Sequence, residues 1–137
     1  MSVATFREAV RAELETDLQI PFKSGLITFL EGTGSVRGDV GCVWVAGYRE
    51  NGDSVQEQII DLRVRVYRKF IQVRDPLNAI DPTALEDTAE LVESALRDKQ
   101  AAQFGVWFFR PVSTEIDLAT QGVEVTVTAI RANPFTV

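Results

Sequence analysis

Residues 59–70 read IIDLRVRVYRKF, a run in which apolar side chains alternate with charged or polar ones. Successive side chains of a β-strand point to opposite faces of a sheet, so this alternation predicts a strand with one buried and one polar face. The buried face is expected to carry Ile60, Leu62, Val64 and Val66. The polar face is expected to carry Asp61, Arg63, Arg65, Tyr67 and Lys69. Cations are thus concentrated on one strand of a chain whose formal net charge is -6.

This strand is expected to form the return half of a long β-hairpin. Residues 42–50 (CVWVAGYRE) form a largely apolar run, typical of a strand covered on both faces. The Asn51-Gly52 pair predicts a type I′ turn, because both central residues of that turn have positive φ. The return strand is predicted over residues 55–73, which would reach about 60 Å at about 3.3 Å per residue. A strand of that length must bend or project beyond its sheet, and a projecting arm needs a partner surface.

Two amphipathic helices are predicted, one before the hairpin and one after it. The first covers residues 2–18 and has either Ser2 or Thr5 as its N-cap, Thr5 having capping-box spacing to Glu8. The second begins at Asp81-Pro82, with the aspartate as N-cap and the proline at the first helical position. The apolar stripe of the first helix consists of Val3, Phe6, Val10, Leu14 and Leu18. That of the second consists of Leu85, Ala89, Val92, Ala95 and Leu96, opposite an acidic side of Glu86, Asp87, Glu90 and Glu93.

The remaining segments complete an α+β pattern. A short strand is predicted over residues 25–30 (GLITFL), followed by a glycine-rich loop at 31–41. Two closing strands are predicted within residues 105–117 (GVWFFRPVSTEID) and 122–131 (GVEVTVTAIR). The order of elements predicts a single α+β domain over residues 1–137, with a mostly antiparallel sheet of four or five strands flanked by two helices.

Composition excludes several classes of site. The 137 residues contain one cysteine, Cys42, and no histidine. No intrachain disulfide can therefore form, and the usual partner of a nucleophilic cysteine and the commonest metal ligand are both missing. No secretory signal and no membrane-spanning stretch is expected. The acidic balance argues against nucleic-acid binding over the whole surface. We expect no catalytic, cofactor or metal site, and a non-enzymatic protein.

Individual motifs point the same way. The GTGSVRG loop precedes a strand, whereas a phosphate-binding loop must open a helix. The carboxylates of the second helix lie opposite its apolar stripe, so we expect a solvated face rather than a catalytic pair. Trp44, Trp107, Phe108 and Phe109 are expected in the core or in an interface, and the alternative is that they line a ligand cavity.

The charge distribution suggests an interface between copies. The strand cations and the helix carboxylates lie on separate faces, which suits head-to-tail packing of identical subunits. Amphipathic side chains on a half-exposed strand, or protection of a sheet edge, are the alternative explanations of the cations. The candidate subunit-interface or lumen residues are Arg63, Arg65, Tyr67 and Lys69, with Glu86, Glu90 and Glu93 as the acidic counterpart.

As a pattern over nearly its whole length, the chain resembles the tail terminator (tail completion) proteins of long-tailed phages. The resemblance rests on the helix TFREAVRAEL (5–14), the hairpin GCVWVAGYRENGDSVQEQIIDLRVRVYRKF (41–70), the acidic helix DPTALEDTAELVESALRD (81–98) and the closing strands. It implies a protomer of a hexameric ring that caps the tail tube and joins it to the head. DNA would pass through the lumen.

The same resemblance implies the setting. The partners would be the tail tube protein and head–tail connector proteins, at the head-proximal end of the virion tail, with assembly in the host cytoplasm and no membrane. A head–tail connector, either stopper or adaptor, is an alternative at the same junction. A small-ligand-binding or enzymatic α+β domain, with an aromatic cavity around Trp44 and Trp107, is the alternative from another class.

Overall fold

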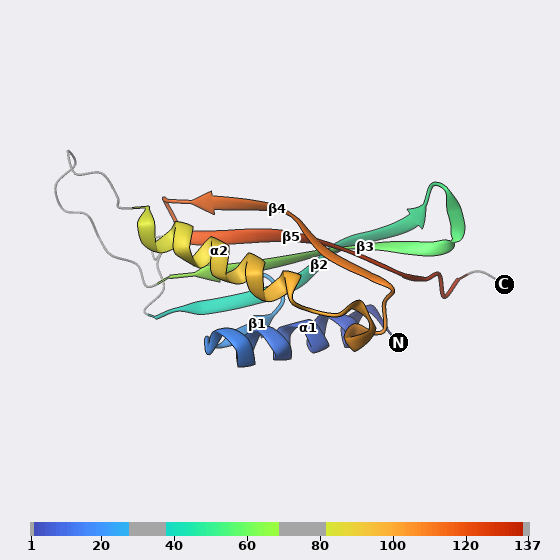
Figure 1. The fold of residues 1–137 in the computed structure, drawn as a ribbon, viewed down its shortest axis with the longest axis horizontal. Coiled ribbons are helices and arrows are strands. Elements are labelled where there is room, and N and C mark those ends of the chain that lie inside the picture. Colours follow the sequence, from blue (N-terminus) through green and yellow to red (C-terminus); the bar gives the residue numbers. More distant parts are fainter. Residues whose placement is uncertain (1, 28–37, 69–81, 136–137) are drawn as a thin grey trace.

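A computed structural model describes residues 2–27, 38–68 and 82–135 (Figure 1). Two α-helices, one 3₁₀ helix and five strands follow one another in these ranges. In chain order they are α1 (Val3–Leu18), β1 (Phe22–Ser24), β2 (Val40–Asn51), β3 (Ser54–Tyr67), α2 (Thr83–Arg97), η1 (Ala101–Phe104), β4 (Phe108–Asp117) and β5 (Gly122–Ala132). The glycine-rich loop, Lys69, the predicted strand end at 69–73 and Asp81 lie largely or wholly outside the described residues.

The strands form one sheet in the order β1-β2-β3-β5-β4. Only β1 and β2 pair in parallel, and the other neighbours are antiparallel. The predicted fold class, an α+β domain with a mostly antiparallel sheet and two helices, is confirmed. The early strand was predicted over residues 25–30 but spans residues 22–24, and Gly25, with a φ of 92°, follows it. Residues 25–27 are not in a strand, and 28–30 lie outside the described residues.

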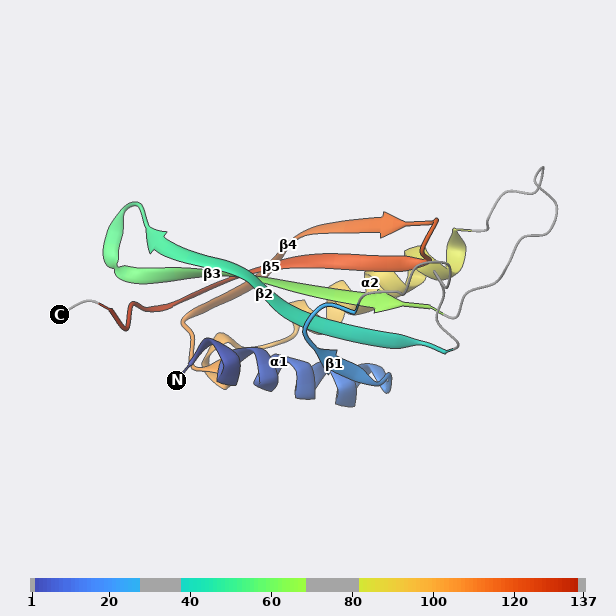
Figure 2. The same ribbon diagram turned by 180° about the vertical axis from the view of Figure 1, so that it is seen from behind.

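Both helices pack on the same face of the sheet. α1 lies against β1 and β2, and α2 lies against β4 and β5 (Figures 1 and 2). The Oγ of Ser2 accepts a hydrogen bond from the Thr5 amide at 3.1 Å, which makes Ser2 the N-cap of α1. α2 begins at Thr83, with Pro82 as its N-cap residue and no capping side chain. No helix in the described residues is both long enough and apolar enough to cross a membrane.

The core lies between the helices and this face of the sheet. β3 contributes the predicted apolar face, because Ile60, Leu62, Val64 and Val66 are fully buried. β5 contributes Val123, Val125, Val127 and Ala129 directly opposite them. From the helices, the stripes predicted from spacing supply Phe6, Val10 and Leu14 of α1 and Leu85, Ala89, Val92 and Leu96 of α2.

The hairpin turn differs from the prediction. Asn51 pairs with Ser54, so the two loop residues are Gly52 and Asp53. Neither Asn51 nor Gly52 has positive φ, so the prediction of a type I′ turn is wrong. Instead, the Oδ1 of Asn51 accepts a hydrogen bond from the Asp53 amide at 3.3 Å, as in an Asx turn.

The end of the β2–β3 hairpin extends beyond β1 and beyond both helices (Figures 1 and 2). We call residues 48–57 the arm. The chain after β5 runs beside it: the amide of Asn133 donates to the Gln56 carbonyl at 2.8 Å, and its Nδ2 donates to the Val55 carbonyl at 2.9 Å. Tyr48 and Val55 on the arm are exposed.

Candidate assembly surfaces

The sheet face turned away from the helices carries charged side chains of β3 and β5. We call it the open face, and Figure 2 looks onto it. The register places the side chains in rows across the strands. One row runs from Cys42 of β2 through Arg65 of β3 and Glu124 of β5 to Glu115 of β4. The charged face predicted for β3 is therefore the middle of this surface.

Arg65 is held from several sides on the open face. Its Nε donates to Oε1 of Glu124 at 2.9 Å, and its Nη1 donates to the Tyr67 hydroxyl at 2.8 Å. Its guanidinium also lies 5.3 Å from the ring centroid of Trp44, within cation–π range. Burial by itself would lower the pKa of Arg65, but the hydrogen bonds to Tyr67 and Glu124 raise it above its ordinary value. The charge of Arg65 is therefore permanent and its position is fixed.

Arg63, two residues before Arg65 on the same face of β3, is held in a similar way. Its Nε and Nη2 donate to the two carboxylate oxygens of Asp61 at 3.1 and 3.0 Å. Its Nη1 donates to Oε2 of Glu124 at 3.4 Å. Hydrogen bonding to Asp61 raises the pKa of Arg63. Asp61, Arg63, Glu124 and Arg65 thus form a continuous, internally neutralised chain of charges, which we call the open-face network.

The other predicted interface residues are not gathered at one place. Tyr67 is 2% exposed, and its ring packs over the Cα of Gly122. Glu86 and Glu90 are exposed on α2, on the other side of the sheet from Arg63 and Arg65. Glu93 forms an ion pair with Arg97, four residues later on α2, with an Nη2–Oε1 distance of 2.8 Å. Within one chain, the carboxylates of α2 therefore do not meet the cations of β3.

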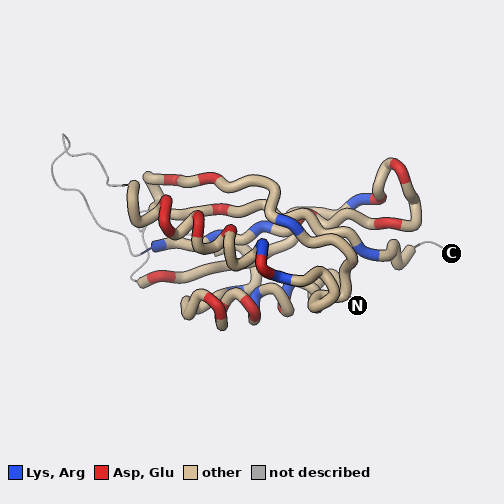
Figure 3. Tube along the Cα trace, in the orientation of Figure 1, with Lys and Arg blue, Asp and Glu red and all other residues tan. Residues whose placement is uncertain are grey.

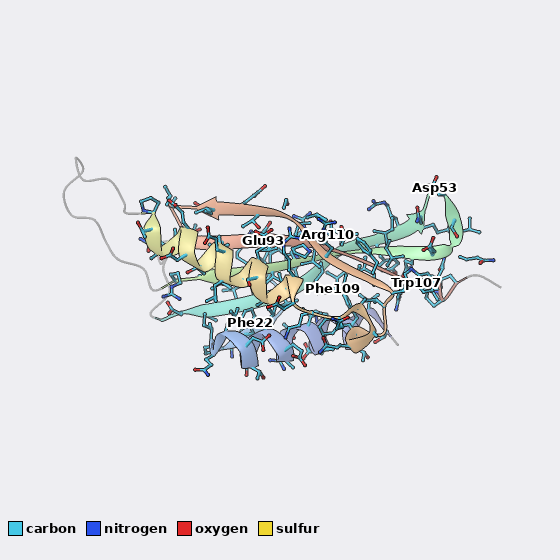
Figure 4. The ribbon with its side chains drawn as sticks, viewed as in Figure 1. Phe22, Asp53, Glu93, Trp107, Phe109 and Arg110 are labelled. Atoms are coloured by element: carbon cyan, nitrogen blue, oxygen red, sulfur yellow. The ribbon has the colours of Figure 1, made fainter. Side chains whose placement is uncertain are left out.

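The aromatic residues lie in three separate places. Trp44 lies on the open face against Arg65, whereas Trp107 lies near the base of the arm and donates from Nε1 to Glu57 at 3.1 Å (Figure 4). Phe109 packs in the core against Phe6 and Phe104, with ring-centroid distances of 6.2 and 4.9 Å. Trp44 and Trp107 consequently do not share a cavity.

A hollow of about 410 Å³ opens at the end of the sheet where β4 turns into β5. It is lined on one side by Arg65, Glu115 and Glu124 and on the other by Ile116 and Leu118. Among the described residues, no group of three or more cysteine, aspartate or glutamate side chains is arranged to hold a metal ion. The hollow is a surface with mixed apolar and charged lining at the edge of the open face.

Sequence reasoning missed the importance of Glu124 and Glu115. The alternation in GVEVTVTAIR placed Glu124 on a polar face, but only the register of β3 against β5 shows that it lies opposite Arg65. The register of β4 then places Glu115 opposite Glu124. Because the two strands are far from β3 in sequence, no short motif carries this information.

Comparison with solved structures identifies a protein of similar fold. The chain is similar to the PVC sheath/tube terminator of an extracellular contractile injection system, determined by cryo-EM in the extended state. The TM-score is 0.53 and the sequence identity 11%, over 97% of this chain and 57% of the terminator chain. The chain thus spans little more than half the length of that protein. No protein-family model and no curated protein matches the sequence.

Proposed function

We propose that this chain is a non-enzymatic assembly protein of a phage tail, a terminator whose ring caps the tail tube and joins it to the head. The observation that carries the proposal is the fold shared with a sheath/tube terminator over 97% of the chain. A common fold allows unrelated functions, so the surfaces must support the same conclusion. They do so in two ways.

First, the arm projects from the rest of the fold. The arm extends past the helices, exposes Tyr48 and Val55, and is braced by the hydrogen bonds from Asn133. A braced projection with exposed apolar side chains is suited to contact another protein. In a terminator, that partner would be the tail tube or an adjacent subunit.

Second, the open face is stiff. Its arginines are fixed by Asp61, Glu124 and Tyr67, so little side-chain entropy remains to be lost when another surface docks on it. The separation of Trp44 from Trp107 counts against the aromatic cavity of the ligand-binding alternative. Assembly by docking of preformed surfaces is the mechanism that this geometry supports.

The proposal is tested by adding the purified chain to the tail tube protein encoded in the same genome while the tube grows. We expect tubes to shorten as the chain is added, with a ring of density at one tube end in electron micrographs. Light scattering of the chain alone should report a ring of identical subunits. Binding to filled heads but not to tubes would identify a connector instead, and binding to neither would reject the proposal.

A further inference from the structure

Two oppositely charged residues lie unpaired at the two edges of the sheet. Lys23 is on β1 and Glu115 is on β4, which are the first and last strands in the spatial order. Both side chains are exposed, and neither forms an ion pair among the described residues. Glu86 and Glu90 are further acidic groups, on α2, the helix that packs against β4. Figure 3 shows acidic residues on α2 and on the part of β4 farthest from the arm.

Lys23 and Glu115 also lie in the same row of the sheet. Lys23 pairs with Cys42, Cys42 with Arg65, Arg65 with Glu124, and Glu124 with Glu115. Phe22 points into the core, so Lys23 points to the open face, where Glu115 also lies. A second copy placed beside the first, without any shift along the strands, would therefore bring Lys23 next to Glu115.

Glu115 is unfavourably placed within its own chain. It stands directly opposite Glu124, and like charges in directly opposed positions destabilise a strand pair. Arg65 and Arg63 both donate to Glu124, and neither bonds to Glu115. Arg110, the one cation of β4, is five positions away from Glu115 and forms no ion pair among the described residues. The unfavourable Glu115–Glu124 pair would be relieved by a cation supplied from outside the chain.

The two edges differ in how they can meet a neighbour. On β1, the Phe22 amide donates to Oε2 of Glu15 and its carbonyl accepts from Arg11, so α1 already occupies these backbone groups. Contact at β1 must therefore be made by side chains rather than by an added strand. Apolar side chains accompany both charges: Val112, Ile116 and Leu118 are exposed beside Glu115, and Leu26 is exposed beyond β1.

We propose that the β4 edge of one copy packs against the β1 edge of the next, with Glu115 pairing to Lys23 across the junction. The partner is a second copy of this chain, because both halves of the contact are on one chain but at opposite edges. Such a contact is heterologous, and repetition of it generates a closed ring when the rotation allows. The inference rests on the proposed function and names the subunit interface of the ring. It is a different contact from the pairing of Arg63 and Arg65 with α2, which stays a prediction.

Cross-linking tests the interface directly. Within one chain the two positions are four strand spacings apart, about 19 Å. In a Cys42→Ala background, the Lys23→Cys/Glu115→Cys protein treated with a short bis-maleimide, unable to span that distance, should give a ladder of covalent oligomers. The two single-cysteine proteins are the matched controls, and they should give no species beyond a dimer. If the double variant gives no covalent oligomers although light scattering shows that it forms the ring, the proposed interface is wrong and the proposed function is unaffected.

Charge exchange gives a second, independent measurement. Lys23→Glu and Glu115→Lys should each reduce the oligomer fraction at low salt by about tenfold or more, and the double exchange should restore it. Asp98→Lys at the end of α2, an exposed position outside the arm and outside both sheet edges, changes the net charge as Glu115→Lys does and should leave assembly unchanged. If the single variants assemble like the wild type, the ion pair is wrong. If the wild-type chain is monomeric both in solution and on tail tubes, the proposed interface and the proposed ring are both wrong.

Discussion

Replacement of Gly41 by alanine tests how closely β1, β2 and α1 pack. Gly41 lies on β2 opposite Phe22 of β1, and the Phe22 ring covers the position that a side chain would occupy. A methyl group at Gly41 would stand 2.6 Å from Cδ1 of Phe22, whereas carbon atoms in favourable contact are about 3.5–4.0 Å apart. The ring would have to retreat by about 1 Å. Since Phe22 is 4% exposed, it has no open space into which to move.

The expected magnitude follows from this overlap. Overpacking of a well-packed core destabilises by about 1–3 kcal/mol. Alanine in a strand gains about 0.5–1 kcal/mol over glycine, because the unfolded chain is less flexible. The net loss for Gly41→Ala should therefore be about 1–2 kcal/mol. Gly47 provides the control on the same strand, since a methyl group there would contact nothing within 4 Å and its φ is not positive.

Urea unfolding followed by tryptophan fluorescence measures the difference. With a urea dependence of about 1–3 kcal/mol per molar, Gly41→Ala should lower the midpoint by about 1 M, and Gly47→Ala should leave it unchanged or raise it slightly. The Phe22→Leu/Gly41→Ala double variant should lose less stability than the two single variants lose in total, because the shorter side chain removes the overlap. Equal midpoints for Gly41→Ala and Gly47→Ala would refute the packing described for Phe22.

Three further predictions concern charge and burial. Glu124→Gln should destabilise by about 1–3 kcal/mol in urea unfolding, because two arginines lose their carboxylate, whereas Glu115→Gln in the isolated subunit should be neutral or stabilising. Burial raises the pKa of the Cys42 thiol, so a thiol reagent at mildly alkaline pH should label it only after unfolding, and rapid labelling of the folded protein would contradict its burial. Hydrogen bonding from Arg11 lowers the pKa of Glu8, so the stability difference between the wild type and Glu8→Gln should be present above the unfolded pKa of about 4.3 and disappear as the pH falls below it.

The alternation of β3 predicted the core correctly because it follows from the geometry of a single strand. Ile60 through Val66 had to face one side, whatever the partners of the strand were. The same holds for Phe6, Val10 and Leu14, whose spacing is a property of one helix. In each case the physical rule acts within one element, so the sequence of that element is sufficient.

Predictions failed where two distant segments decide the outcome. β1 lies at residues 22–24 because Phe22 fills the space over Gly41, a fit that hydrophobicity alone does not reveal. The pairing of the β3 cations with carboxylates of another copy stays a prediction, but the sequence did not reveal that Glu124 of the neighbouring strand bonds Arg65 within the chain. Only the register of the sheet identifies that neighbour. The expectation that Arg63, Arg65, Tyr67 and the α2 carboxylates lie at a subunit interface or lumen stays a prediction.

The small size of β1 has a consequence for local opening of the structure. β1 is attached to β2 through three residues, whereas β3 is paired along nearly its whole length on both sides. Amide hydrogens of β3 should therefore exchange with solvent most slowly, and those of β1 should exchange through a separate, less costly opening of the α1–β1 segment. This segment carries Lys23. A neighbouring copy docked against it would suppress that opening, so ring closure would be recorded as slower exchange at β1 and not at β3.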